Sequence, residues 1–305
     1  MIRLRRIGWR TGYGLSATRR IASTGGLAIV LMLGGAVAGA RSPAFASEPG
    51  YTIISAESSS NSSSPKSITA TCPAGQQVLS PGIQIRGALG HVLVDDIQPN
   101  AALTSVTAKA YEDGAGTSEA WSVRVSAVCV NARIGLERVA RTTSATSVAT
   151  SIDFPCPDAK VVVGVGAAIN GGLGRVSLVA MAPASANGPN RVSIAARETA
   201  DGTADTWTLT GYAICDFPHA LQYQNVDETS ADSAQLKTSA AGCGTSYVVI
   251  GSGFQVLDGG SPTAQVVVHS IRPRYPRFTT AEAAEDRNGY SGSWRLRSYA
   301  ICARP

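Results

Sequence analysis

The sequence has few of the side chains on which enzymes most often depend. Its 305 residues include only three histidines, and no two of them have the spacing of a metal site. Neither an H-E-x-x-H nor a G-x-S-x-G motif is present. Because there is no paired nucleophile and base and no set of metal ligands, we expect no catalytic residues, no metal ion and no cofactor. An enzyme is therefore the least favoured function.

A helical pattern and a C-x-x-C pair are missing as well. No stretch keeps its apolar residues at helical spacing over the length of a helix. Short runs of β-branched residues instead alternate with Gly, Pro and Asn at even intervals, which predicts an all-β fold. The six cysteines include no C-x-x-C pair, which argues against a zinc site.

The first 46 residues differ in composition from the rest. They contain seven arginines and no acidic residue, and an apolar run at 25–40 precedes Ala44-Phe45-Ala46. This order predicts that residues 1–46 are a signal peptide and that residues 47–305 are secreted, either extracellular or associated with the cell wall. A retained membrane anchor is the alternative, although the run is short and rich in glycine. An even number of cysteines in an exported chain indicates disulfides.

Removal of this leader changes the sign of the net charge. The whole chain has 26 basic and 21 acidic residues, a net charge of +5. Without the seven leader arginines it has 19 basic and 21 acidic residues, a net charge of −2. We therefore expect no nucleic-acid partner, and no membrane partner after cleavage. The composition leaves the oligomeric state open.

One segment of the chain occurs three times. WSVRVSAVCV at 121–130 returns as WTLTGYAICD at 207–216 and WRLRSYAICA at 294–303. In each copy another cysteine precedes the last one, by 57, 59 and 59 residues. The sequence therefore contains three repeats, at 51–132, 133–217 and 218–305.

Other residues recur at fixed offsets within the repeats. A glycine follows the first cysteine by ten residues, a proline follows a valine by seven, and a glutamate precedes the tryptophan by nine. The glycine interrupts an apolar run, which predicts paired strands with a bulge or tight bend at that glycine. The recurring residues are Gly82, Gly166 and Gly253; Pro99, Pro183 and Pro273; and Glu112, Glu198 and Glu285.

The repeated segment predicts a strand with one buried face. Because alternate residues of a strand share a face, Trp121, Ala127 and Cys129 lie on the same side. The repeat symmetry selects one pairing among those that six cysteines allow. The predicted disulfides are Cys72–Cys129, Cys156–Cys215 and Cys243–Cys302.

Two architectures satisfy these repeats. One is a single pseudo-three-fold, β-prism-like domain over residues 47–305, in which each repeat supplies one sheet. The other is a row of three small β-sandwiches. The segments between the repeats keep an apolar alternation, as at Ile134, Leu136 and Val139, so they resemble strands more than linkers. This observation favours the single three-fold domain.

The repeated tryptophans and glutamates allow a structural and a functional interpretation. A tryptophan at the head of an apolar face is typical of a core residue, and a stacking platform for sugar is the alternative. In the structural interpretation, Glu112, Glu198 and Glu285 accept hydrogen bonds from backbone or indole N–H groups. In the functional one, the three carboxylates contact a ligand together. Catalysis by a carboxylate pair is the weakest interpretation, because each repeat supplies only one.

The glycine-rich turns at 87–91, 171–175 and 257–262 are better candidates for binding. They recur at one place in each repeat, and loops on a rigid scaffold commonly carry recognition. Plain hairpin turns are the structural alternative. The candidate contact residues are Gly87, Gly90, His91, Gly171, Gly174, Arg175, Gly259 and Gly260.

The pattern C-P-x-G-x4–6-G…P…W-x7-C resembles uncharacterised secreted repeats common in high-GC Gram-positive bacteria. Cys72-Pro73, Cys156-Pro157 and the repeated W-x7-C carry this resemblance over nearly all of 47–305, and the third repeat departs from it with Gly244 in place of proline. The resemblance implies no established activity. In plan, three disulfide-bonded β repeats are also similar to β-prism proteins of the jacalin and vitelline outer-layer type. Several of those bind carbohydrate through loops at one end.

These observations together predict a secreted, non-enzymatic binding protein. Its predicted partner is a glycan or cell-wall polymer, recognised through the repeated glycine turns. The alternative is a structural or protein-interaction component of the cell surface that has no small ligand, because a fold alone does not fix a function.

Overall fold

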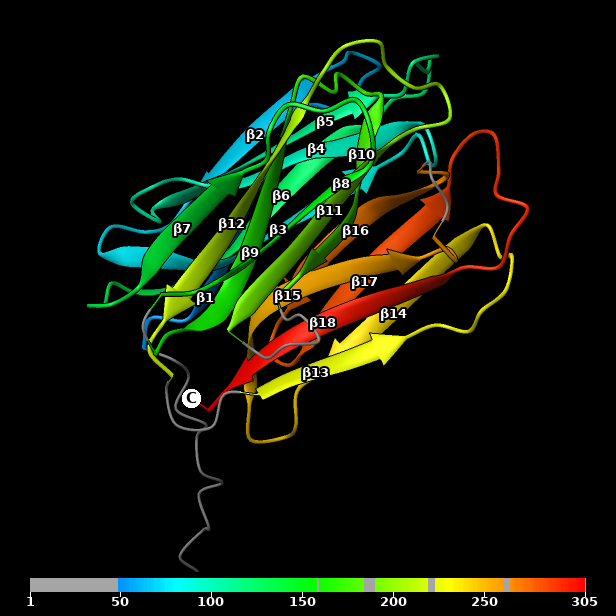
Figure 1. Ribbon diagram of the computed structural model, residues 1–305. Helices are drawn as coiled ribbons and strands as arrows, with labels where there is room; N and C mark the ends of the chain where they lie inside the picture. The colour runs from blue at the N-terminus through cyan, green and yellow to red at the C-terminus, as the bar shows by residue number, and fades with distance from the viewer. Residues whose placement is uncertain (1–48, 158, 184–189, 219–222, 261–263, 305) are drawn as a thin grey trace, which may run out of the picture. The chain divides into compact units, whose positions relative to one another are not determined.

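The computed structural model describes residues 49–157, 159–183, 190–218, 223–260 and 264–304 (Figure 1). The chain divides after Ala44, and every described residue belongs to the part that begins at Phe45. The expected signal peptide, residues 1–46, lies outside the described residues. Within the described ranges, no helix is long and apolar enough to cross a membrane.

Each repeat contributes six strands. The first repeat forms β1 (Thr52–Glu57), β2 (Lys66–Thr71), β3 (Gln76–Arg86), β4 (Val92–Pro99), β5 (Ser105–Glu112) and β6 (Ser122–Asn131). The second forms β7 (Glu137–Thr142), β8 (Thr150–Pro155), β9 (Val161–Asn170), β10 (Val176–Ala182), β11 (Arg191–Glu198) and β12 (Thr208–Asp216). The third forms β13 (Tyr223–Glu228), β14 (Leu236–Gly242), β15 (Val248–Leu257), β16 (Val266–Arg274), β17 (Phe278–Glu285) and β18 (Arg295–Ala303).

The strands assemble into three antiparallel six-stranded sheets (Figure 1). In every repeat the first, sixth and third strands lie together in one sheet, and the second, fifth and fourth lie together in another. The sheet orders are β1-β6-β3-β16-β17-β14, β2-β5-β4-β9-β12-β7 and β13-β18-β15-β10-β11-β8. The predicted all-β fold is confirmed, and the segments between the repeats form strands, as expected, in β7 and β13.

Every sheet is shared between two repeats. β4 of the first repeat pairs with β9 of the second, β10 of the second with β15 of the third, and β16 of the third with β3 of the first. The repeats thus form a cycle, although each sheet itself is open. The predicted pseudo-three-fold domain is confirmed and the row of separate sandwiches is not found. The expectation that each repeat supplies one whole sheet is wrong, because the two halves of a repeat pack face to face and their free edges pair with the neighbours.

The repeated glycine lies where two repeats approach each other. A Cβ on Gly166 would lie 2.4 Å from the carbonyl oxygen of Ile97 in the neighbouring repeat, and one on Gly253 would lie 2.5 Å from that of Met181. The repeated proline is part of the same junction, since Pro99 Cδ would lie 2.7 Å from the added atom on Gly166. Real Cβ atoms do not fit at such distances, so glycine is required for this pairing.

The predicted bulge occurs three residues before that glycine and not at it. The register shift in β3 falls between Val78 and Ser80, and the strand and its pairing then continue through Gly82. Equivalent shifts occur in β9 and β15. The expectation of paired strands divided at the glycine is therefore wrong: the segment is one continuous strand, and the glycine allows close approach.

The buried face of the repeated segment and the three disulfides are confirmed. Trp121, Trp207 and Trp294 are 0–1% exposed, and the alternate residues that follow Trp121 are fully buried to Cys129. The disulfides Cys72–Cys129, Cys156–Cys215 and Cys243–Cys302 have Cα–Cα separations of 5.8, 5.7 and 5.6 Å. Each bond links the end of the second strand to the sixth strand, and so joins the two halves of its repeat.

A fragment of one repeat tests this sharing of sheets. We expect residues 47–132 to show no cooperative thermal unfolding as a monomer, because β3 and β4 both lose their partners from other repeats. Circular dichroism during heating, with sedimentation to establish the monomer, is the measurement. The chain 47–305 is the control and should unfold in a single transition. A monomeric fragment that unfolds cooperatively would show that the repeat is a self-sufficient sandwich.

Candidate functional site

The glycine-rich turns of one repeat lie against the fifth strand of another. A Cβ on Gly90, between β3 and β4, would lie 2.8 Å from the carbonyl oxygen of Glu285 at the end of β17. A Cβ on Gly174, between β9 and β10, would lie 2.1 Å from the carbonyl oxygen of Glu112 at the end of β5. Both glycines also have a positive φ, +81° and +79°. These two predicted contact residues are thus required for the packing of the repeats.

The third glycine-rich turn contacts the neighbouring repeat through a hydrogen bond and not through a glycine. Ala264 N–H donates to the carbonyl oxygen of Glu198 (2.7 Å), at the end of β11. A Cβ on Gly259 or Gly260 would meet no atom within 4 Å, so both glycines are open to solvent. They line a pocket of about 510 Å³ together with the ion-paired side chains Arg197 and Asp258. Residues 261 and 262 of the predicted turn lie outside the described residues.

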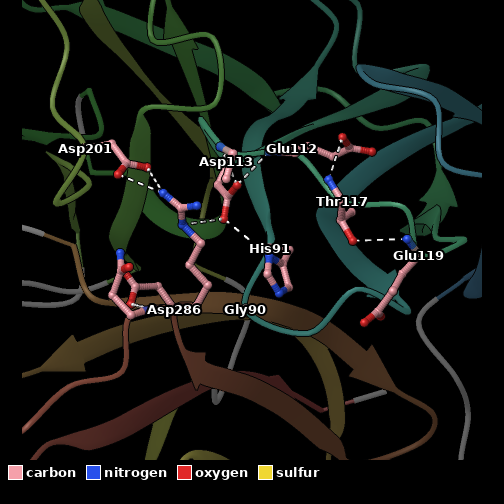
Figure 2. Close-up of polar contacts among 12 residues, drawn as sticks. Gly90, His91, Glu112, Asp113, Thr117, Glu119, Asp201 and Asp286 are labelled. Atoms are coloured by element: carbon pink, nitrogen blue, oxygen red, sulfur yellow. Dashed lines mark hydrogen bonds and ion pairs between the residues drawn. The ribbon is translucent and has the colours of Figure 1, made fainter.

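Side chains from all three repeats meet beside these junctions (Figure 2). Arg287 Nη2 donates to both carboxylate oxygens of Asp201, at 2.9 Å each. Arg287 Nε also lies 3.5 Å from Asp113 Oδ2, and His91 Nδ1 lies 3.5 Å from the same oxygen. We call these four residues the inter-repeat cluster. Of them, only His91 is among the residues predicted from the sequence.

A pocket of about 660 Å³ borders the cluster at Asp201. Five of its seven lining residues have polar side chains, and all seven come from the second repeat: Arg175, Glu198, Asp201, Gly202, Thr203, Ala204 and Asp205. Arg175, predicted from the sequence, donates from Nη1 to the carbonyl oxygen of Gly202 (3.3 Å). Carboxylates accept hydrogen bonds and a guanidinium donates them, so this pocket offers both kinds of partner to a ligand rich in hydroxyl groups.

Gly87 and Gly171, the remaining predicted turn residues, lie against their own repeats. A Cβ on Gly87 would lie 2.4 Å from the carbonyl oxygen of Ala120, and one on Gly171 would lie 3.0 Å from that of Thr206. Both oxygens belong to the residue just before the repeated tryptophan. These two glycines therefore hold the turns in place and do not face the pocket.

The repeated glutamates are hydrogen-bonded to the core in two repeats out of three. Trp121 Nε1–H donates to Glu112 Oε1 (2.8 Å), and Trp207 Nε1–H donates to Glu198 Oε1 (3.1 Å). In the third repeat, Glu285 Oε1 and Trp294 Nε1 are buried without a hydrogen-bond partner. The structural interpretation thus describes Glu112 and Glu198. The three carboxylates are not equivalent, because Glu285 does not accept a hydrogen bond from its tryptophan.

Two buried lysines contact the tryptophans and were not predicted. Lys66 Nζ lies 4.6 Å from the centre of the Trp121 ring, and Lys237 Nζ lies 4.7 Å from that of Trp294. Burial lowers the pKa of Lys66, although the nearby carboxylate of Glu112 opposes this. The second repeat has Thr150 at this place. The available signal was a lysine six residues before the first cysteine in two of the three repeats.

Within the described ranges, no group of three or more His, Cys, Asp or Glu side chains is arranged to hold a metal ion. Comparison of the chain with models of known protein families and with curated proteins gives no match. The function of the site is therefore inferred from its own geometry.

Replacement of the repeated glutamates should have unequal effects. We expect Glu112→Ala to lower the free energy of unfolding by about 2 kcal/mol, because it leaves the buried indole N–H of Trp121 without its acceptor. Glu285→Ala should lower it by less than about 1 kcal/mol, since no hydrogen bond to Trp294 is lost. Urea denaturation of both variants is the measurement. Equal losses in the two variants would contradict the difference between the repeats.

A buried histidine ties the third repeat to the first turn. His269 in β16 is 3% exposed, and its Nε2 accepts a hydrogen bond from Gly90 N–H (3.1 Å). Burial lowers the pKa of its imidazole from 6.5 to about 4. The folded state therefore binds this proton less readily than the unfolded state. Its contribution to stability is complete above pH 6.5 and is lost as the pH falls towards 4.

We expect His269→Gln to remove that part of the pH dependence, because glutamine keeps an acceptor and does not titrate. The free energy of unfolding of the unmodified protein should fall between pH 6.5 and 4, by up to about 1.4 kcal/mol per pH unit more than that of the variant. Urea denaturation at several pH values gives both curves. Parallel curves would show that His269 is not held neutral by the fold.

Proposed function

We propose that the protein is a secreted, non-enzymatic binding protein that recognises a polysaccharide or cell-wall polymer beside the inter-repeat cluster. The observation that carries the proposal is the pocket at Asp201, which is lined by Asp201 of the cluster and by Arg175 of the second glycine turn. Acceptors and donors face a common space there. A ligand that presents many hydroxyl groups satisfies both.

The scaffold supports recognition by fixed groups. Asp201 accepts hydrogen bonds from Arg287, and Arg175 donates one to the carbonyl oxygen of Gly202. Both side chains are thus already ordered before a ligand binds. The pocket is open and its outer residues, Ala204 and Asp205, are exposed, which suits a segment of a chain more than an enclosed small molecule. The three disulfides are typical of an oxidising extracellular environment, where such polymers occur.

Binding to glycans and insoluble polysaccharides tests the proposal. A glycan array and pull-down on cell-wall material should show binding that a soluble form of the same sugar competes away. Asp201→Asn should weaken that binding by about tenfold, because a charged acceptor is lost. Asp153→Asn is the matched control, because Asp153 also pairs with an arginine, Arg191, but lies in the edge strand β8. It should bind as the unmodified protein does.

Two results would contradict the proposal. The first is the absence of any binding that soluble sugar can compete, which would favour a structural or protein-interaction role at the cell surface. The second is an equal loss of binding in Asp201→Asn and Asp153→Asn, which would place the sugar elsewhere or make the attraction a general effect of charge.

A further inference from the structure

The three shared sheets differ at one equivalent position. The repeated glycine of the third strand pairs directly with a residue of the sixth strand on the outward face. In two sheets that residue is tyrosine: Gly166 pairs with Tyr212, and Gly253 pairs with Tyr299. In the third sheet, Gly82 pairs with Ser126.

The two tyrosines are buried and hydrogen-bonded. Tyr212 and Tyr299 are only 5% and 6% exposed although they point to the outward face. Gln98 Nε2–H donates to the hydroxyl of Tyr212 (2.9 Å), and the hydroxyl of Tyr299 donates to Gln255 Oε1 (3.0 Å). An aromatic ring opposite a glycine is a known way of completing a sheet surface.

Where serine replaces tyrosine, the sheet surface contains a hollow of about 160 Å³. The polar side chains that line it come from four strands: Ser55 (β1), Gln84 (β3), Arg124 and Ser126 (β6), and Arg272 and Arg274 (β16). This volume equals that of about five waters. It is smaller than the pocket of a typical drug-sized ligand, so the hollow suits a single chemical group of a ligand and not a whole one.

The hollow carries excess positive charge. Arg124 donates to Ser55 Oγ (2.8 Å), and Arg272 donates to Gln84 Oε1 (2.9 Å), so both of these hydrogen bonds are to neutral groups. Glu282 Oε1 lies 4.0 Å from Arg272 Nη2. The Nε of Arg272 is buried and has no hydrogen-bond partner. Burial and the neighbouring Arg274 both lower the pKa of the Arg272 guanidinium.

Arg272 and Arg274 have no counterpart in the other sheets. They flank the repeated proline of the third repeat, whereas the residue before that proline is Gln98 or Ala182 in the other repeats and the residue after it is Asn100 or Ala184. In this sheet the first repeat thus has serine in place of the tyrosine, and the third repeat supplies two arginines beside it. Guanidinium groups bind carboxylate, sulfate and phosphate through paired N–H donors, and such an anion would supply the acceptor that Arg272 Nε lacks.

We propose that this hollow binds one oxyanion group, a carboxylate, sulfate or phosphate carried by a larger ligand. Arg124, Arg272 and Arg274 supply the charge, and Ser126 and Gln84 supply neutral contacts at the floor. The site lies on strands of a sheet face and shares no residue with the pocket at Asp201. This proposal therefore does not depend on the function proposed above, and an experiment can contradict one of the two proposals without contradicting the other.

Titration of the chain 47–305 with inorganic sulfate, inorganic phosphate and glucuronate tests the proposal and separates the three sources. Calorimetry should show saturable binding of at least one anion. Arg272→Gln should weaken it by about tenfold, as expected for a lost charged hydrogen bond. Ser126→Tyr, which places in the hollow the residue that the other two repeats have at this position, should abolish it.

Arg297→Gln is the matched control, because Arg297 holds in the third repeat the position that Arg124 holds in the first. Its anion binding should stay within about twofold of that of the unmodified protein. A lack of saturable binding to all three anions would overturn the proposal, as would an equal loss in Arg297→Gln and Arg272→Gln. If Ser126→Tyr does not fold, as judged by its thermal transition, Arg272→Gln and its control decide the outcome.

Discussion

The close approach of a glycine to a carbonyl group in the next repeat is the contact on which the whole fold depends. At Gly166 and Gly253 the neighbouring oxygen leaves no room for a side chain. Only with glycine there can the third strand of one repeat pair with the fourth strand of another. This pairing is only two residue pairs long at each junction. It nevertheless converts three half-complete sandwiches into one cyclic arrangement in which every sheet is shared.

Sharing the sheets determines where function can reside. The inner faces are occupied by tryptophan, valine and the disulfides, which are buried and not accessible to a ligand. The outward faces and the turns remain, and both are held by contacts between repeats. The positions at which the three repeats differ are the candidates for function, because the residues that all three repeats share are explained by the fold. The inter-repeat cluster and the hollow at Ser126 are both departures of this kind.

The sequence was sufficient to predict the strands, the buried tryptophan face and the disulfides, because each rests on offsets that recur in every repeat. It was not sufficient to predict which strands pair between repeats, since local alternation does not identify a partner. Asp113, Asp201 and Arg287 were missed for a related reason. They stand one, three and two residues after the repeated glutamate, so no alignment of the repeats brings them together. The hollow at Ser126 becomes visible only when the register with Gly82 is known.

Backbone contacts across the three junctions test the shared sheets most directly. Nuclear Overhauser effects between opposing strands of the deuterated chain 47–305 report such contacts without altering the protein. The account predicts them for Ile97 with Ala167, Met181 with Phe254, and Ile83 with Ile271. Inter-strand effects confined to pairs within single repeats would contradict it, and would show that each repeat forms its own closed sandwich.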